Sequence, residues 1–471
     1  MDNQQEKKWY QRMPHTYLIL FIVVLIAAVL TYVLPAGAFE RAIPEGMSRT
    51  VIVPGTYHAV DQKPIGLLAF FRAIPEGMIA AGNIIFLIML STGCFKIVNS
   101  TGALESGVGI LLKKVTKANL SGTVVIWIMV FLFSLLGVAV GPEIQIPFVA
   151  ISVTIALGLG YDVLTGLAMI AGGGGVGFAL GPINAAVIGT ADAVMGLPTF
   201  SGQGLRWALW FAGTIVCALV VSLYANSVKK NPEKSLVKDV STEGFGFSKK
   251  FEEYSLTGRQ LAVLLVFIAT LAVEIYGASK KGWYLNEMSA IFVIGGVLAG
   301  IVGGVKLNDI MDGFSQGAKD AANIAIIVGI ARAIQVVLES GNIMDTVIYY
   351  LSNPLAGMSP FVAAILGTIV VGIIHFFIPS GSGLVVAAMP ILGPMLMLMG
   401  LTAQTAVLVV QIGATVPNFI LPTVGAYIAM CSIARVPVNK WWKFGIRLTI
   451  PLYLISWVFV VIAILTNYGP F

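Results

Sequence analysis

The sequence predicts an all-α, polytopic membrane protein, and three observations carry that prediction. Hydrophobic residues make up 58% of the 471-residue chain and charged residues only 11%, whereas soluble domains are about 25% charged. The mean hydropathy is +0.92. Apolar runs of about 17–22 residues recur along the chain, each long enough for a helix to cross a ~30 Å hydrocarbon core. The runs are continuously apolar rather than alternating, which argues against a transmembrane β-barrel.

Basic residues near the ends of the apolar runs predict the orientation, because cytoplasmic loops are enriched in Lys and Arg. Lys7, Lys8 and Arg12 precede the first run, at 16–34, and place the N-terminus in the cytoplasm. The stretch 229–259 holds seven Lys and Arg residues and is predicted to be the largest cytoplasmic loop. The same reasoning places the C-terminus outside. Because the net charge of +6 is spread over loops, nucleic-acid binding is not expected.

The two halves of the chain resemble each other at an offset of 240 residues, give or take one. An extra helix, predicted at 261–276, lies between the halves and inverts the second half relative to the first. Inverted repeats are typical of secondary transporters, in which they provide two equivalent states open to opposite sides. The clearest matches pair Gly160, Thr165, Gly173 and Pro182 with Gly400, Thr405, Gly413 and Pro422.

Each repeat is predicted to contain a re-entrant hairpin, because two apolar arms flank a Gly- or Pro-containing tip and the second arm is short for a complete crossing. The tips are at 141–145 and 379–383. Two ordinary kinked helices are the alternative. The arms are predicted at 122–140 and 146–159 in the first repeat, and at 361–378 and 384–399 in the second.

A discontinuous helix is predicted after each hairpin, near 172–184 and near 413–423, where Gly and Pro interrupt an apolar run. The breaks expose N–H and carbonyl groups that transporters use to hold substrate and ions. The predicted organisation is a cytoplasmic N-terminus with the first helix (1–35), a first repeat (36–226), a cytoplasmic loop (227–259), a linking helix with an external loop (260–287) and a second repeat (288–471).

The two tips and the two breaks are predicted to converge on one central site. Small polar residues also cap helix breaks, and that alternative is open for each polar candidate. The substrate-binding candidates are Glu143, Gln145, Asn184, Ser380, Gly381, Ser382, Asn418 and Thr423. The candidates for ion binding or coupling are Gly141, Gly173, Thr415 and His375.

Glu143 is the sharpest candidate, because a carboxylate inside a membrane is costly and marks a functional position by default. Three roles are open to it: pairing with a substrate ammonium group, carrying a coupling proton, or neutralising a structural partner. His375 ordinarily titrates near neutral pH and is a candidate proton carrier, with a packing role as the alternative. Asp192 and Glu274 are expected near helix ends, with no role beyond hydration or topology.

No catalytic set is evident in the sequence. The three His and three Cys residues are scattered without metal-ligand spacing, so neither a metal site nor a cofactor is expected, apart from a coupling Na⁺ or H⁺. The three cysteines lie in apolar segments and do not indicate a disulfide framework.

Several motifs resemble those of the DcuC-type family of four-carbon dicarboxylate and basic amino acid carriers, in its YfcC-like branch. They include HFFIPSGSG at 375–383, ARAIQVVLE at 331–339 and VPGTYH at 53–58, and the resemblance covers nearly the whole chain. It implies the ion transporter superfamily fold and a homodimer in the bacterial inner membrane. It also implies scaffold helices between the protomers and a transport domain that moves by an elevator mechanism.

The sequence therefore predicts a secondary active transporter of small amino acids or carboxylates, and the resemblance adds exchange of basic amino acids. The family usually carries paired Glu residues at the first tip, where this chain has only Glu143. This departure favours a neutral or anionic substrate, or a changed coupling ion. A sodium- or proton-coupled dicarboxylate carrier is the first alternative, and a channel or an intramembrane enzyme is a remote one.

Overall fold

The computed structural model describes residues 16–469 except 44–50, 140, 147, 243–244, 246–252, 282 and 284. The described chain is almost entirely helical, and seven of its helices are long and apolar enough to cross a membrane. A further candidate span is a helix pair, Ala325–Ser340 and Met344–Leu355, bent by 87°. The predicted all-α, polytopic membrane fold is confirmed. The basic residues before the first helix lie outside the described residues.

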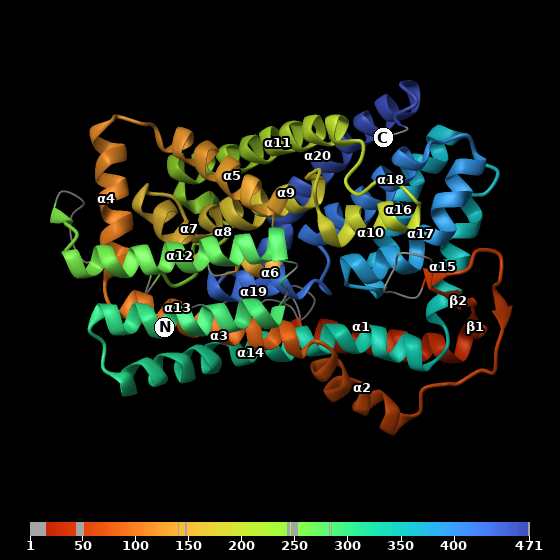
Figure 1. The fold of residues 1–471 in the computed structure, drawn as a ribbon, viewed down its shortest axis with the longest axis horizontal. Helices are drawn as coiled ribbons and strands as arrows, with labels where there is room; N and C mark the ends of the chain where they lie inside the picture. The colour runs from red at the N-terminus through yellow and green to blue at the C-terminus, as the bar shows by residue number, and fades with distance from the viewer. Residues whose placement is uncertain are drawn as a thin grey trace, which may run out of the picture.

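The helices form two layers, which Figure 1 shows one above the other. The lower layer is organised by α14, which is 34 residues long and packs against α1, α2 and α3. The helix α13 packs on α3, and α12 packs on α13. The lower layer consists of α1 (Thr16–Val33), α2 (Leu67–Ala80), α3 (Gly82–Ser100), α12 (Gly258–Lys281), α13 (Leu285–Gly303) and α14 (Leu307–Ser340).

The upper layer takes helices from both halves of the chain. In it α5 packs on α9, α18 packs on α16 and α17, and the long helices α11 and α20 lie together. Its first-half members are α5 (Gly122–Ala139), α7 (Phe148–Gly158), α8 (Val163–Leu167), α9 (Gly173–Leu180), α10 (Thr190–Val194) and α11 (Gln203–Lys230). Its second-half members are α16 (Pro360–Phe377), α17 (Gly381–Leu398), α18 (Ala403–Thr415) and α20 (Val438–Leu465).

Shorter elements connect the layers. The helix α6 contacts both α3 and α9, and α19 contacts both α14 and α20. At one end α4 stands across the layers, and at the other α15 does so (Figure 1). These helices are α4 (Ala103–Lys117), α6 (Pro142–Gln145), α15 (Met344–Ser352) and α19 (Gly425–Ile433). The π-helical turns are η2 (Ala168–Gly172) and η3 (Ala185–Gly189), and the 3₁₀ turns are η4 (Pro232–Lys234), η6 (Asn353–Leu355) and η7 (Val416–Phe419).

The described parts of residues 35–62 form a strap beside α15. In the strap, β1 (Gly37–Ala38) pairs antiparallel with β4 (His58–Ala59), and β2 (Arg41–Ala42) pairs antiparallel with β3 (Val51–Ile52). The strap also reaches the upper layer, because β3 contacts α17.

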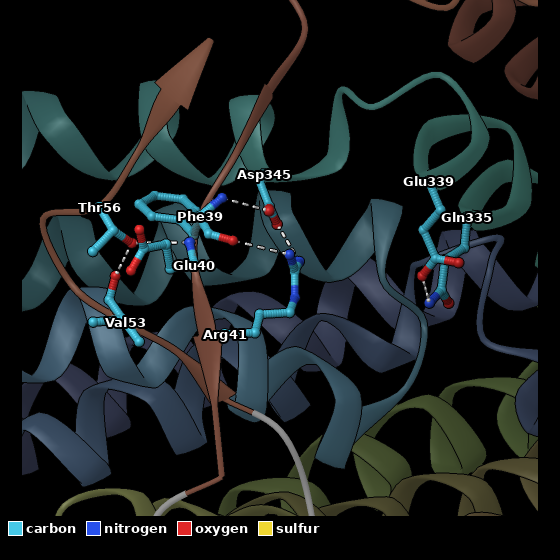
Figure 2. A network of polar contacts seen from close by, with 8 residues as sticks. All are labelled: Phe39, Glu40, Arg41, Val53, Thr56, Gln335, Glu339 and Asp345. Atoms are coloured by element: carbon cyan, nitrogen blue, oxygen red, sulfur yellow. Dashed lines mark hydrogen bonds and ion pairs between the residues drawn. The ribbon is translucent and has the colours of Figure 1, made fainter. Parts of the chain in front are cut away.

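Polar and aromatic contacts fix the strap to α15. The guanidinium of Arg41 forms an ion pair with the Asp345 carboxylate at 2.8 Å, and the backbone N–H of Phe39 donates to the same carboxylate at 3.0 Å (Figure 2). The ring of Tyr57 stacks on that of Tyr349 with centroids 4.2 Å apart. Because the Asp345 side chain is only 6% exposed, its two partners satisfy a carboxylate that water hardly reaches.

The two halves share local structure where the sequence repeat pairs them. Gly160 and Gly400 both have positive φ, of 77° and 89°. Two residues later, Asp162 and Thr402 are N-caps whose side chains accept the backbone N–H of the residue three positions on. The helices α8 and α18 therefore begin in the same way, 240 residues apart. This equivalence supports the repeat, and the inversion of the second half stays a prediction.

The two predicted hairpins differ in the length of their second arms. In the first half α7 has 11 residues, too few for a complete crossing. In the second half α17 begins at Gly381, three residues before the predicted arm, and its 18 residues are long and apolar enough to span. The prediction of a short second arm is therefore wrong for α17, because Ser380 caps the helix at its very start.

The discontinuous helix predicted near 172–184 is broken at 181–184 and not at the glycines 172–175, where the chain remains helical. The π-helical turn η2 leads directly into α9. Gly173 and Gly177 pack closely on α5, because a Cβ would lie 2.7 Å from the Val130 carbonyl oxygen and 1.9 Å from the Ser134 carbonyl oxygen, respectively. Gly174 lies against α6, where a Cβ would be 1.6 Å from the Gln145 side chain. Small residues let membrane helices approach to backbone contact.

Replacing Gly177 with Ala is expected to lower the free energy of unfolding by about 1–3 kcal/mol, because the new Cβ would overlap the α5 backbone. The matched control is Gly204→Ala in α11, where a Cβ meets nothing within 4 Å. That change is expected to stabilise by up to about 1 kcal/mol, through helix propensity. Thermal unfolding of the purified variants checks both signs, and equal shifts in the same direction would contradict the packing assignment.

Candidate functional site

The first predicted tip lies where the two layers meet. It forms the one-turn helix α6, which contacts α3 in the lower layer and α9 and α19 on the other side. Pro142 opens this helix, as suits a position whose N–H would have no partner within the helix. Glu143 is therefore held at the boundary between the layers.

Glu143 and Gln145 point to different neighbours. The half-buried Glu143 interacts electrostatically with the hydroxyl of Tyr427 on α19. Its carboxylate also folds back toward Gly141, where an added Cβ would lie 2.8 Å from Oε2. Gln145 is fully buried, and its Nε2 donates to the Gly174 carbonyl at 3.4 Å. The first tip therefore joins α9 through Gln145 and leaves the Glu143 carboxylate facing α19.

The first helix break lies at 181–184, and Asn184 fixes its shape. The Oδ1 atom of Asn184 accepts the backbone N–H of Val187 at 3.1 Å, and its Nδ2 donates to the carbonyl of Phe178 at 2.8 Å. Both ends of the amide are thus bonded to backbone. Asn184 acts here as a helix cap, which was the alternative left open for the polar candidates.

The carbonyl groups that α9 leaves free at this break receive hydrogen bonds from the second half of the chain. Gln411 Nε2 donates to the carbonyls of Ala179 and Gly181, at 3.1 and 3.0 Å. Thr415 Oγ1 donates to the Ala179 carbonyl at 3.0 Å. The two discontinuous helices are therefore joined end to side by polar groups buried from water.

Gln411 is a site residue that the sequence analysis misses. The sequence feature that could have identified it is a single amide side chain within the otherwise apolar stretch 406–412. Its Oε1 is buried and has no hydrogen-bond partner among the described residues. Buried polar atoms are nearly always hydrogen-bonded, so this oxygen marks a position where a ligand or an ordered water would bind.

The second tip meets the first break. Ser380 caps α17, its Oγ accepting the Gly383 N–H at 3.4 Å. A Cβ at Gly381 would lie 3.1 Å from the Val187 side chain of η3, so the tip packs against the turn that follows Asn184. Ser382 lies in the first turn of α17 and is half-buried. The positive end of an 18-residue helix thus points toward the break of the other half.

His375 and Asn418 form a second buried polar group. The ring of His375 lies beside the Asn418 side chain, without a hydrogen bond of normal geometry. Both His375 ring nitrogens, Asn418 Oδ1 and Thr423 Oγ1 are buried without a hydrogen-bond partner among the described residues. These residues come from α16, η7 and the break that follows it, so the second break is polar and incompletely bonded.

Gly173 does not belong to this polar group. A Cβ there would lie 2.7 Å from the Val130 carbonyl oxygen of α5, which makes it a helix-packing position. Thr415 is bonded to the backbone of α9. Of the four residues expected to bind or couple to an ion, His375 is thus the one with side-chain polar atoms left unbonded within the described chain.

Asp192 and Glu274 are buried, contrary to the expectation that they are hydrated. Asp192 accepts the Phe200 N–H at 2.7 Å and lies close enough to the buried Arg206 to interact electrostatically with it. Arg206 donates to Gln404 of α18 at 3.0 Å. Glu274 is enclosed within the lower layer. Closeness to a helix end in sequence does not reveal that other helices cover these side chains.

Comparisons with known proteins give one family. The model of the DcuC family, described as C4-dicarboxylate anaerobic carrier, matches residues 13–465. The chain is 28% identical to the "Putative basic amino acid antiporter YfcC" of Escherichia coli (strain K12), with 99% of each chain covered. It is 27% identical to an uncharacterized protein of Haemophilus influenzae, with 98% of this chain and 99% of the relative covered.

Two solved transporter structures are similar over nearly the whole chain. The YdaH transporter of Alcanivorax borkumensis has a TM-score of 0.46 at 16% identity, with 97% of this chain and 100% of that chain covered. MtrF of Neisseria gonorrhoeae, from a class of antimetabolite efflux pumps, has a TM-score of 0.44 at 16% identity, with 96% of each chain covered.

Replacing Gln411 with Leu is expected to lower the free energy of unfolding by about 1–3 kcal/mol, because the Gly181 carbonyl loses its donor in a buried place. The same change at the exposed Gln203, in the first turn of α11, is the control and should stay within about 0.5 kcal/mol. Thermal unfolding in detergent measures both. An unchanged Gln411→Leu midpoint would show that the bonds between the broken helices contribute no stability.

Proposed function

This chain belongs to the DcuC family of carriers, and from that premise we propose an elevator-type secondary transporter of small amino acids or carboxylates. The protein is a multi-span membrane transporter, and its substrate and mechanism are what the proposal adds. The observation that carries it is the position of Glu143, on a one-turn helix between two layers of helices and next to two joined, broken helices. A site on such a boundary changes its exposure when one layer slides past the other.

The substrate carboxylate is recognised at the second tip. The N-terminal turn of α17 offers backbone N–H groups and the Ser380 and Ser382 hydroxyls, and a helix N-terminus favours negative charge. The unbonded oxygen of Gln411 and the Asn418 amide offer further polar contacts from α18 and η7. In this proposal Asn184 shapes the break, and substrate does not need its amide.

Glu143 pairs with an amino group of the substrate or carries a proton. For a basic amino acid exchanger, the carboxylate at the layer boundary pairs with the cationic group. The relative named as a basic amino acid antiporter supports this assignment. The coupling ion, where one is used, is Na⁺ or H⁺, and His375 is the candidate proton carrier because its ring nitrogens are left unbonded.

A sodium- or proton-coupled dicarboxylate carrier is the second candidate. The observation that favours it is that the first tip carries one carboxylate, Glu143, where a dibasic substrate calls for more negative charge. The description of the family as dicarboxylate carriers agrees with it. In this case the α17 N-terminus binds one carboxylate and Glu143 handles a proton.

We also propose a homodimer in the bacterial inner membrane, with the N-terminus in the cytoplasm and the C-terminus outside. The lower layer presents exposed apolar residues along α12 and α13, such as Leu265, Ile268, Ile294 and Leu298. This layer forms the static scaffold in the elevator, and the upper layer moves with the tips and breaks.

Replacing Glu143 with Gln is expected to lower the transport rate at least 100-fold while leaving the unfolding midpoint within a few degrees of the wild-type value. The amide keeps the shape of the side chain but removes its negative charge. The control is Glu233→Gln, the same change in an exposed ion pair with Lys238. Counter-transport is measured in proteoliposomes loaded with L-ornithine, L-arginine or succinate. Wild-type rates in a well-folded Glu143→Gln protein would remove Glu143 from the mechanism.

A cysteine at Ser382 is expected to react with a polar thiol reagent and to be protected by a transported substrate, because the second tip faces the aqueous site. A cysteine at Leu384, which lies two residues further on and is fully buried, is the matched position and should stay unreactive. Labelling rates with and without substrate test this directly. A Ser382→Cys protein that is inert in every condition would contradict an accessible tip.

A further inference from the structure

A cavity outside the candidate site lies between residues 63–65, α2 and α14. Its volume is about 190 Å³, and its polar lining comes from Lys63, Arg72, Glu76 and Ser340. Apolar atoms of both helices complete the wall. The proposed transport mechanism uses none of these residues.

Hydrogen bonds place this cavity at the C-terminal end of the apolar helix α1. Gln62 Nε2 donates to the carbonyls of Thr31 and Tyr32, in the last turn of α1, at 3.1 and 3.3 Å. The hydroxyl of Tyr32 donates to the Ile65 carbonyl at 3.1 Å. Tyr residues are enriched at membrane–water interfaces. A residue at the end of an apolar helix, beside an interfacial Tyr, is expected at the level of the lipid headgroups, and Lys63 has this position between Gln62 and Ile65.

The cavity carries more positive than negative charge. Arg72 Nε pairs with Glu76 Oε1 at 2.9 Å, which engages one edge of the guanidinium, and the Arg72 side chain is still 65% exposed. A guanidinium has five N–H donors, so its other edge remains free to bind an anion. Lys63 adds a second cation without a carboxylate partner in the described ion pairs. Two cations against one carboxylate suit a singly charged phosphate diester.

The helix α2, which lines the cavity, has an exposed apolar face. Leu68 and Ile79 are each 80% exposed and Phe71 is 51% exposed. Positions 68, 71, 72 and 79 lie on neighbouring parts of one helix face, so these side chains continue from Arg72 along α2. A headgroup site that opens onto an apolar helix face matches the shape of a phospholipid.

We propose that this cavity binds the headgroup of an anionic phospholipid. Lys63 and the free edge of Arg72 hold the phosphate, and the acyl chains lie on Leu68 and Phe71. A bound lipid would then brace α2 against α14, the helix that organises the lower layer.

The test is a thermal-shift titration of the full-length protein in detergent with added phosphatidylglycerol. The unfolding midpoint of the wild type should rise, because a ligand that binds only the folded state stabilises it. Phosphatidylethanolamine and inorganic phosphate should produce no comparable rise. Lys63→Gln and the double variant Lys63→Gln/Arg72→Gln should lower the apparent affinity at least tenfold. Lys306→Gln, the same charge change at the other end of α14, should leave it unchanged.

Three results would overturn the proposal. The first is no shift of the wild type with phosphatidylglycerol. The second is an equal shift in Lys63→Gln, a variant that removes no hydrogen bond or ion pair among the described residues and so should fold. The third is an equal shift with inorganic phosphate alone, which would make the cavity a free-anion site.

Discussion

Broken helices in hydrocarbon are tolerated only where their freed backbone groups find partners within the protein. In this chain, side chains of the second half form hydrogen bonds with backbone carbonyls that the first break leaves free. Gln411 and Thr415 of α18 donate to the Ala179 and Gly181 carbonyls at the end of α9. The first break is thereby held by the second half of the chain, whereas the second break keeps buried polar atoms that have no hydrogen-bond partner among the described residues. The remaining polar atoms, such as Gln411 Oε1, are what the joined breaks offer to a ligand.

The same constraint explains where the candidate site lies. The first tip packs beside α9, which α5 also packs against, and the second tip, where Ser380 caps α17, packs against η3. The helix α6, with Glu143, then falls between the upper layer and α3 of the lower layer. A transporter needs a site that both binds substrate and changes its exposure, and a site on the boundary of two packed layers serves both needs.

The sequence predicts the fold class, the family and the polar character of both breaks, because length, hydropathy and Gly/Pro placement act locally. It does not predict what depends on distant packing. The glycines 172–175 read as a break, yet the chain remains helical there and the small residues serve close packing by neighbouring helices, as Gly173 does for α5. Asp192 reads as hydrated, yet other helices cover it. Gln411 is missed because one amide in an apolar run gives no sign of the carbonyls it meets.

Hydrogen–deuterium exchange, with and without substrate, tests the central claim that the joined breaks and the two tips form the binding site. L-ornithine, L-arginine and succinate would each be added to the purified protein, in sodium and in choline buffer. The account predicts that at least one of them slows exchange at 141–146, at 181–190, at 379–384 and at 416–424, while the strap and α12 are unaffected. Protection confined to other segments, or no protection with any of the three, would contradict it.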